Sequence, residues 1–203
     1  MAGIYLLRHG ETDWNRMNLF RGHSEIGLSE RGRAQARAAA AALVDRDITA
    51  IYTSPMIRSL ETARFCSNEL GLPHVETPAL SDPDCGLWTG KDLDHARATH
   101  PHEFSMMEDS PSMLRFPEGE SVVEVADRVS RFVLRDLDSE AEGSVLLVTH
   151  NFIFQVFTMV VMGCSLDGLY RVKMDNGAIS EYAKRGAVIM MVRMNENGHL
   201  GGI

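Results

Sequence analysis

The chain has 203 residues, 44% of them hydrophobic and 24% charged, a composition typical of a globular protein that buries a proper core. Its formal charge of −8 argues against sequence-independent binding to nucleic acid, which needs a basic surface, although a few arginines can still make one pocket positive. No apolar run approaches the roughly 20 residues needed to cross a bilayer, so we expect no membrane partner.

Strands and helices alternate in the first part of the chain. Residues 4–8 predict a buried strand, and residues 29–45 predict an alanine-rich helix that begins with a capping serine. Residues 48–54 form the next predicted strand. We expect Pro55 to open a helix over about residues 56–70, which a glycine and a proline then end.

Residues 78–120 differ from the rest of the chain. They are rich in Pro, Asp, His and Met, and they show weak periodicity with only a short helix around residues 92–99. We interpret them as a cap-like excursion from the main sheet.

The last part returns to regular patterning. Residues 121–137 predict an amphipathic helix, residues 144–150 a continuous apolar strand and residues 152–162 another helix. Residues 177–184 and 187–194 predict two strands of a hairpin. We therefore expect one domain over residues 1–203, a three-layer α/β/α sandwich with a mostly parallel, mixed sheet of about six strands.

Cysteine usage indicates the compartment. The three cysteines, Cys66, Cys85 and Cys164, are widely spaced and form no CxxC pair, so we expect neither disulfide bonds nor a zinc cluster. The N-terminus lacks the basic segment, the apolar segment and the cleavage site of a secretory signal. These features predict a cytoplasmic protein.

Charged and reactive side chains follow the ends of three predicted strands. Arg8 and His9 end the first strand, His150 ends the strand before residue 152, and Arg58 lies in the first turn of the helix after Pro55. Ligands bind at the carboxyl ends of strands in open α/β sheets, so these groups are expected to converge if the strands are neighbours. Arginine forks suit phosphate oxygens, which makes a phosphate-bearing ligand the natural candidate.

The motifs "LLRHGET", "SPMIRSLETA" and "LLVTHN" resemble the histidine phosphatase superfamily, which has the phosphoglycerate-mutase-like fold. The stretches "GLSERGRAQA", "CGLWTG" and "FPEGES" resemble further segments of that family, so the resemblance covers nearly the whole chain. It implies that His9 is a nucleophile that forms a phosphohistidine, which water then hydrolyses. It also implies that Arg8, Asn15, Arg58 and His150 bind the phosphoryl oxygens, with no metal and no other cofactor.

The proton donor departs from the family pattern. The family usually has a glutamate four residues before the first glycine of "GLWTG", and this chain has Asp82 there. Asp84 is a second candidate, and the motif register favours Asp82 by about two to one. Arg21, Gly22, His23 and Asn151 are candidate substrate contacts, although Arg21 and His23 are equally well explained as surface residues.

We expect a phosphomonoesterase that acts on a small phosphorylated metabolite of the sugar phosphate, phosphoglycerate or α-ribazole phosphate type. A phosphoglycerate mutase is the alternative enzyme. The aspartate at position 82 also motivates a third hypothesis, a catalytically weak phosphate-binding or scaffold module. The strand over residues 187–194 is a candidate edge for a homodimer, or an edge that its flanking charges protect.

Overall fold

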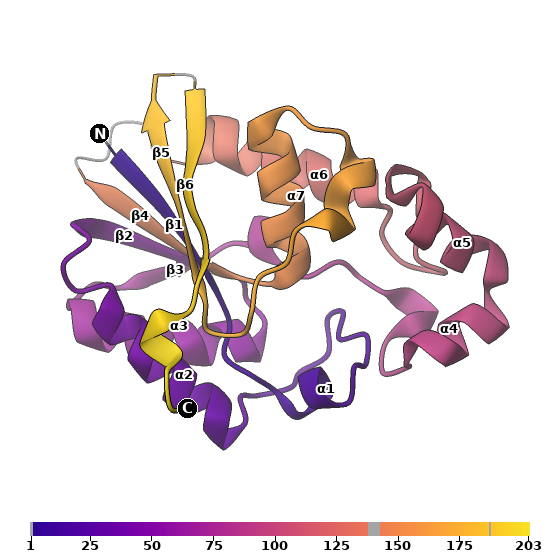
Figure 1. Cartoon of the computed structure of the whole chain (residues 1–203), viewed down its shortest axis with the longest axis horizontal. Coiled ribbons are helices and arrows are strands. Elements are labelled where there is room, and N and C mark those ends of the chain that lie inside the picture. Colours follow the sequence, from indigo (N-terminus) through magenta and orange to yellow (C-terminus); the bar gives the residue numbers. More distant parts are fainter. Residues whose placement is uncertain (1, 138–142, 187) are drawn as a thin grey trace.

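A computed structural model describes residues 2–137, 143–186 and 188–203. Its centre is one six-stranded sheet, with strands in the order β3-β2-β4-β1-β5-β6 (Figure 1). The strands are β1 (Ala2–Arg8), β2 (Ile48–Thr53), β3 (His74–Glu76), β4 (Ser144–Thr149), β5 (Ile179–Arg185) and β6 (Val188–Glu196). The first four strands in this order are parallel, and the β5–β6 hairpin is antiparallel.

Helices cover both faces of the sheet. Figure 1 shows α2 and α3 on one side and α6 and α7 on the other, while α4 and α5 extend beyond the sheet. The helices are α1 (Asp13–Arg16), α2 (Glu30–Ala42), α3 (Ile57–Leu70), α4 (Leu93–Thr99), α5 (Pro101–Asp109), α6 (Val122–Arg131) and α7 (Asn151–Met162). This arrangement confirms the expected three-layer sandwich with a mostly parallel sheet.

The apolar run of β1 contributes to both layers at once. Tyr5 and Leu7 pack into the core beneath α2 and α3, while Ile4 and Leu6 pack into the core beneath α6 and α7. Successive side chains of a strand point to opposite faces, so a strand between two helix layers must be apolar throughout. The four consecutive apolar residues of "IYLL" meet this requirement.

Helix α3 matches the range predicted after Pro55 to within one residue, with Met56 as its extended N-cap, whose N–H donates to Ser54 Oγ at 3.3 Å. One predicted helix was wrong in its form. The helix predicted over residues 121–137 is α6 followed by a π-helical turn over Phe132–Asp136. Apolar periodicity does not distinguish these two kinds of helical turn.

The segment over residues 78–120 holds more helix than expected. Helix α5 was missed because Phe104 and Met107 are its only buried side chains, too few to give a helical pattern. Three 3₁₀ turns, Pro78–Leu80, Gly86–Trp88 and Pro111–Met113, complete the segment. Its core is the fully buried Trp88 ring, which contacts Phe20, Phe104 and Phe116.

Within the residues that the structure describes, no helix has the length and apolar character needed to cross a membrane.

Candidate active site

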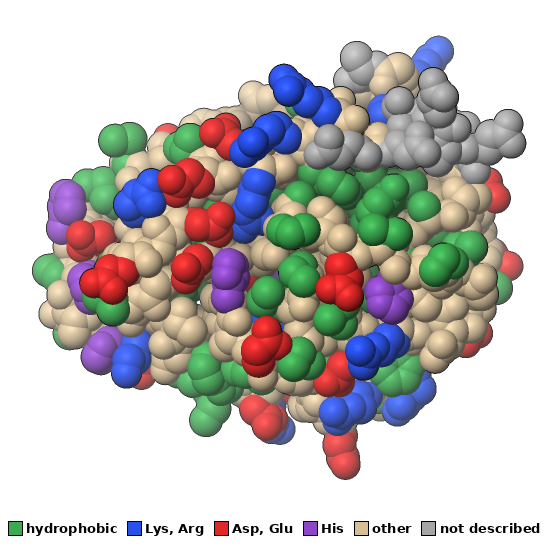
Figure 2. Space-filling model, turned by 180° about the vertical axis from the view of Figure 1, so that it is seen from behind, with side chains coloured by type: hydrophobic (Ala, Val, Ile, Leu, Met, Phe, Trp, Pro, Cys, Tyr) green, Lys and Arg blue, Asp and Glu red, His purple; other side chains and the backbone are tan. Residues whose placement is uncertain are grey.

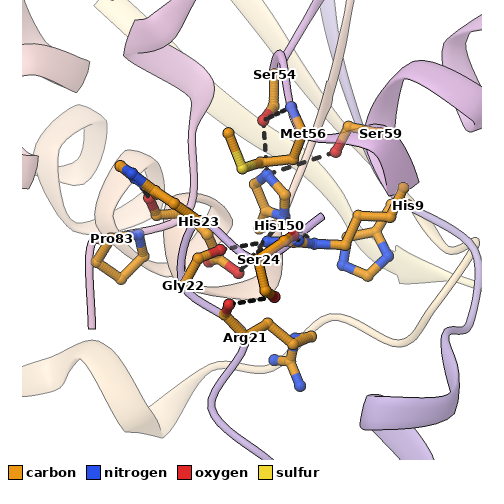
Figure 3. A network of polar contacts seen from close by, with 12 residues as sticks. His9, Arg21, Gly22, His23, Ser24, Ser54, Met56, Ser59, Pro83 and His150 are labelled. Carbon is orange, nitrogen blue, oxygen red and sulfur yellow. Dashed lines mark hydrogen bonds and ion pairs between the residues drawn. The ribbon is translucent and has the colours of Figure 1, made fainter. Parts of the chain in front are cut away.

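The ends of three neighbouring strands form the site. Strand β4 lies between β2 and β1, and Arg8 pairs with Thr149 in the parallel register. The His9 N–H donates to the Thr149 carbonyl at 2.9 Å, and the rings of His9 and His150 come within 5.2 Å between centroids. The rings meet edge to face at 61°, and Figure 3 shows both residues in the same network. The predicted convergence of the strand ends is therefore confirmed.

A close backbone crossing supports the loop after His9. A side chain at Gly10 would meet the Gly32 carbonyl oxygen at 2.2 Å, and a side chain at Gly32 would meet the Glu11 carbonyl oxygen at 2.0 Å. The Gly10 N–H donates to Thr62 Oγ1 at 3.2 Å. The loop is thus seated on α2 and α3, and both glycines are needed because no Cβ fits between the two backbones.

His9 has a defined tautomer. Its Nδ1 lies 2.7 Å from the Gly10 carbonyl oxygen, which can only accept, so Nδ1 carries the proton and Nε2 has a free lone pair. Burial lowers the pKa of His9 well below its usual 6.5, and the positive charges of Arg58 and Arg8 lower it further. The ring is therefore neutral at pH 7, with Nε2 available as a nucleophile.

Arg8 is a buried cation whose hydrogen bonds are incomplete. Its Nη1 donates to the Met174 carbonyl, and among the described residues its buried Nε has no partner. Burial lowers the pKa of Arg8 to about 9, and the nearby Arg21 contributes to the shift. Arg8 thus stays charged at pH 7 and keeps a donor free for an anion.

Arg58 is fully buried and is held from several sides. Its Nη1 donates to the Ser24 carbonyl at 3.0 Å, and its Nη2 donates to the Gly22 carbonyl at 2.9 Å. Nη2 also donates to Asp82 Oδ2 at 3.0 Å, and Nε donates to His150 Nδ1 at 3.3 Å. The Arg58 guanidinium therefore links the loop around Gly22 to Asp82 and His150.

His150 is a neutral ring between Arg58 and two hydroxyl groups. Its Nε2 lies 2.8 Å from Ser54 Oγ and 3.4 Å from Ser59 Oγ, as Figure 3 shows. Burial lowers its pKa well below 6.5, and the positive charge of Arg58 adds to this effect. Hydroxyl groups can donate or accept, so Nδ1 can accept from Arg58 or donate to a ligand without leaving Nε2 unsatisfied. The role of Ser54 was not predicted, and only its position at a strand end could have indicated it.

The structure separates the two aspartates by their surroundings. The Asp82 carboxylate is buried, 3.0 Å from Arg58 Nη2 and 3.6 Å from His150 Nδ1. Asp84 Oδ1 instead accepts from the Gly86 N–H at 2.9 Å, and the Asp84 backbone is bound to Glu120. Asp82 therefore lies among the site residues, and Asp84 shapes the turn that follows.

The orientation of Asn15 depends on a residue that the sequence analysis missed. Asn15 Oδ1 accepts from the Thr12 N–H and hydroxyl at 2.9 Å each, and from Asn176 Nδ2 at 3.3 Å. Asn176 Nδ2 also donates to the His9 carbonyl at 3.1 Å. Because these donors all meet Asn15 Oδ1, the NH₂ group of Asn15 faces away from them. No pattern in the sequence indicates this role of Asn176, because it comes from far along the chain.

The remaining candidates lie around the same site. Gly22 adopts a φ of 49°, and a Cβ there would meet Thr89 Oγ1 at 2.8 Å, so glycine is required. His23 Nε2 hydrogen-bonds the Asp82 carbonyl at 2.9 Å. Asn151 Oδ1 accepts from the Met174 N–H at 2.8 Å. This bond holds Met174, whose carbonyl accepts from Arg8 Nη1.

The motifs and this geometry agree with comparisons to known proteins. The sequence profile of the histidine phosphatase superfamily (branch 1) matches residues 4–197. The chain belongs to this family. It is 26% identical to phosphoserine phosphatase 1 of Hydrogenobacter thermophilus, over 99% of this chain and 95% of that protein. It is 28% identical to the probable phosphoglycerate mutase GpmB of Erwinia tasmaniensis, over 89% of this chain and 84% of that one.

A solved structure of the superfamily supports the same assignment. The mycobacterial glucosyl-3-phosphoglycerate phosphatase in complex with VO₃ matches with a TM-score of 0.87 and 26% identity. The match covers 97% of this chain and all of that one. The predicted family and fold are thereby confirmed.

Two cavities with shared lining residues open at this edge of the sheet. The larger has a volume of about 570 Å³, and the smaller, of about 420 Å³, is lined by Arg8 and Asn15. The two share the residues Asn18, Arg21, Asn151, Gln155 and Tyr170. In the described part of the chain, no group of three or more His, Cys, Asp or Glu side chains is arranged to hold a metal ion.

Proposed function

We propose that this protein is a cofactor-independent phosphomonoesterase that hydrolyses a small phosphorylated metabolite through phospho-His9. The observation that carries the proposal is the neutral His9 ring, whose Nδ1 is bound to the Gly10 carbonyl and which lies beside His150 and within the field of Arg58 and Arg8. A neutral imidazole is a good nucleophile at pH 7, and fixed cations can stabilise the charge on a transferring phosphoryl group.

In the first step, His9 Nε2 attacks phosphorus in line with the ester oxygen. The Nε2–P bond forms while the P–O ester bond breaks. Asp82, which takes up a proton from solvent when the phosphoryl group displaces it from Arg58, gives that proton to the leaving oxygen. Arg8 and Arg58 bind the equatorial oxygens, and the Asn15 amide adds a donor without further charge. His150 donates through Nδ1 once Arg58 turns from that nitrogen to the phosphoryl group.

In the second step, water attacks phosphohistidine. Asp82, now a carboxylate, accepts a proton from the water as the new O–P bond forms and the Nε2–P bond breaks. The products are inorganic phosphate, neutral His9 and protonated Asp82. One carboxyl group thus serves both steps, and it returns its proton to solvent when phosphate leaves and it pairs with Arg58 again.

The two alternative functions have weaker support. A mutase must exclude water while the histidine is phosphorylated, whereas the two cavities of about 570 and 420 Å³ leave room for water and for a varied leaving group. A binding module without turnover needs no proton donor, yet the Asp82 carboxyl lies beside Arg58 and His150.

Partners and location remain predictions. Figure 2 shows acidic and basic side chains interspersed over one face, which presents no extended basic surface for nucleic acid. The cysteines are free, in keeping with a cytoplasmic location. A homodimer through β6 would use a sheet edge on which Val188, Met190, Val192 and Met194 are exposed.

The test is phosphate release from a panel of small phosphomonoesters, with EDTA present and no added metal, by the wild type and by His9→Ala. We expect turnover that is lost in the variant. A variant of the exposed His95, His95→Ala, controls for the loss of a histidine and for contaminating phosphatases. Equal turnover in wild type and His9→Ala would overturn the mechanism. No release from any ester, with vanadate still bound, would favour the mutase or the binding module.

A further inference from the structure

The larger cavity contains one charged group without a partner. Of its described lining residues, three carry charge: Arg21, Asp82 and Glu108. Asp82 is paired with Arg58 at 3.0 Å, and Glu108 is paired with Arg97 at 3.1 Å. Arg21 is thus the one cation of this lining, and no carboxylate of the described residues lies within 4.0 Å of it.

The guanidinium of Arg21 has a free edge. Its Nη1 donates to the Leu19 carbonyl at 3.1 Å, and its buried Nε has no partner among the described residues. The edge formed by Nε and Nη2 therefore has no acceptor among the described residues. Arg21 is partly buried, and an unpaired charge beside apolar walls such as Phe116 and Phe152 is less favourable than a paired one.

The loop that carries Arg21 is anchored on both sides. Before it, the Phe20 N–H donates to the Lys91 carbonyl at 2.9 Å, and the Gly90 N–H donates to the Phe20 carbonyl at 2.8 Å. After it, the Ser24 N–H donates to the Arg21 carbonyl at 3.0 Å. Figure 3 shows Arg21 on the same side of His150 as Ser24. The backbone position of Arg21 is thus set by the fold before any ligand arrives.

We propose that Arg21 recognises a carboxylate of the substrate, so that the enzyme prefers phosphomonoesters whose leaving group carries a carboxylate near the ester oxygen. This proposal rests on the phosphomonoesterase function above. Arg21 lines both cavities, so it stands between the phosphoryl site of Arg8 and Asn15 and the space for the leaving group. A guanidinium edge matches the two oxygens of a carboxylate, and its single charge balances a monoanion better than a second phosphate.

The experiment compares two esters that differ in one group. Glycerol 3-phosphate has a CH₂OH group where 3-phosphoglycerate has a carboxylate. Their dissociation constants are measured by calorimetry on the His9→Ala protein, which binds the esters without turning them over. We expect 3-phosphoglycerate to bind about 10- to 100-fold more tightly, the range for a charge-assisted hydrogen bond. In His9→Ala/Arg21→Gln this ratio falls to near one, and Arg21→Lys keeps part of it.

Arg16→Gln is the matched control. Arg16 lies on the same stretch of chain with a side chain that is 62% exposed, and its loss removes the same charge without touching the cavities. It should leave the ratio unchanged. An equal affinity of the His9→Ala protein for the two esters would overturn the proposal, and so would a ratio that survives Arg21→Gln. Equal weakening of both esters by Arg21→Gln would assign Arg21 to the phosphoryl group instead, and failure of both esters to bind would also contradict the proposal. Absence of turnover in the wild type would overturn only the proposed function, because the binding ratio needs no turnover.

Discussion

The Asp82 carboxylate lies 3.0 Å from Nη2 of Arg58, the guanidinium that we propose as a phosphoryl ligand. The proposed proton donor therefore lies beside the N–H groups of Arg58 that a phosphoryl oxygen needs. The Asp82 carboxylate and a bound phosphoryl group both accept hydrogen bonds through anionic oxygens, so they compete for the same N–H groups of Arg58. Binding of the phosphoryl group must turn Asp82 away from Arg58, toward the ester oxygen that it is proposed to protonate.

Replacing Asp82 with Asn should have opposite effects on binding and on catalysis. Removal of the competing charge should tighten vanadate binding by about tenfold, the equivalent of about 1.4 kcal/mol. Turnover of alkyl phosphates should fall by about 10²- to 10⁴-fold, because their leaving oxygen needs a proton. Turnover of p-nitrophenyl phosphate, which has a good leaving group, should fall much less. Vanadate inhibition and a comparison of the two kinds of ester measure these effects.

Asp84→Asn is the control for Asp82→Asn. The amide oxygen of Asn can still accept from the Gly86 N–H, so vanadate binding and ester preference should not change. Equal losses on alkyl and aryl esters in Asp82→Asn would show that Asp82 is not the acid.

Phosphorylation of His9 should be nearly insensitive to pH between 7.5 and 6. A histidine with the ordinary pKa of 6.5 would be about three-quarters protonated at pH 6 and would react roughly fourfold more slowly. Burial lowers the pKa of His9 well below that value, so its ring stays neutral over this range. Rapid-quench measurement of the acid-labile phosphoenzyme from p-nitrophenyl phosphate gives the rate. A fourfold fall at pH 6 would mean that His9 titrates normally.

Stability should decrease as the pH falls below about 6.5. The pKa values of His9 and His150 are lower in the folded protein than in the unfolded chain. Between the two pKa values the unfolded chain therefore binds protons that the native protein does not bind. Each histidine should reduce the free energy of unfolding by up to about 1.4 kcal/mol per pH unit, from the unfolded pKa down toward the folded one. Urea unfolding of wild type and His150→Asn at pH 7.5, 6.5 and 5.5 measures the slope. A slope that is not reduced in the variant would contradict the assignment.

Gly32→Ala should destabilise the protein, although alanine normally favours a helix by about 1 kcal/mol. The added Cβ would meet the Glu11 carbonyl oxygen at 2.0 Å, and relief of that clash should cost about 1 to 3 kcal/mol. Turnover should fall too, because the displaced backbone at Glu11 lies only two residues after His9. Gly198→Ala, with no atom within 4 Å of the new Cβ, is the control and should change neither property. Unchanged unfolding of Gly32→Ala would show that the two backbones can separate freely.

The sequence alone determined the alternation of strands and helices, because apolar runs and serine caps are local signals. It also located Arg8, His9 and His150 at strand ends and Arg58 at a helix start, since parallel strands bring their carboxyl ends to one edge. The sequence did not predict the elements that have too few buried residues to give a local pattern. Helix α5 buries only Phe104 and Met107, and strand β3 has just three residues.

The motif register favoured Asp82 over Asp84, but only the tertiary structure separated these two carboxylates by their partners. The distinction depends on which carboxylate meets Arg58 and which meets the Gly86 N–H, and these partners come from different elements. The amide orientation of Asn15 likewise depends on Asn176, about 160 residues away in the chain. Arg21 became distinctive for the same reason, because a charge can be recognised as unpaired only when every neighbour that could pair with it is in position.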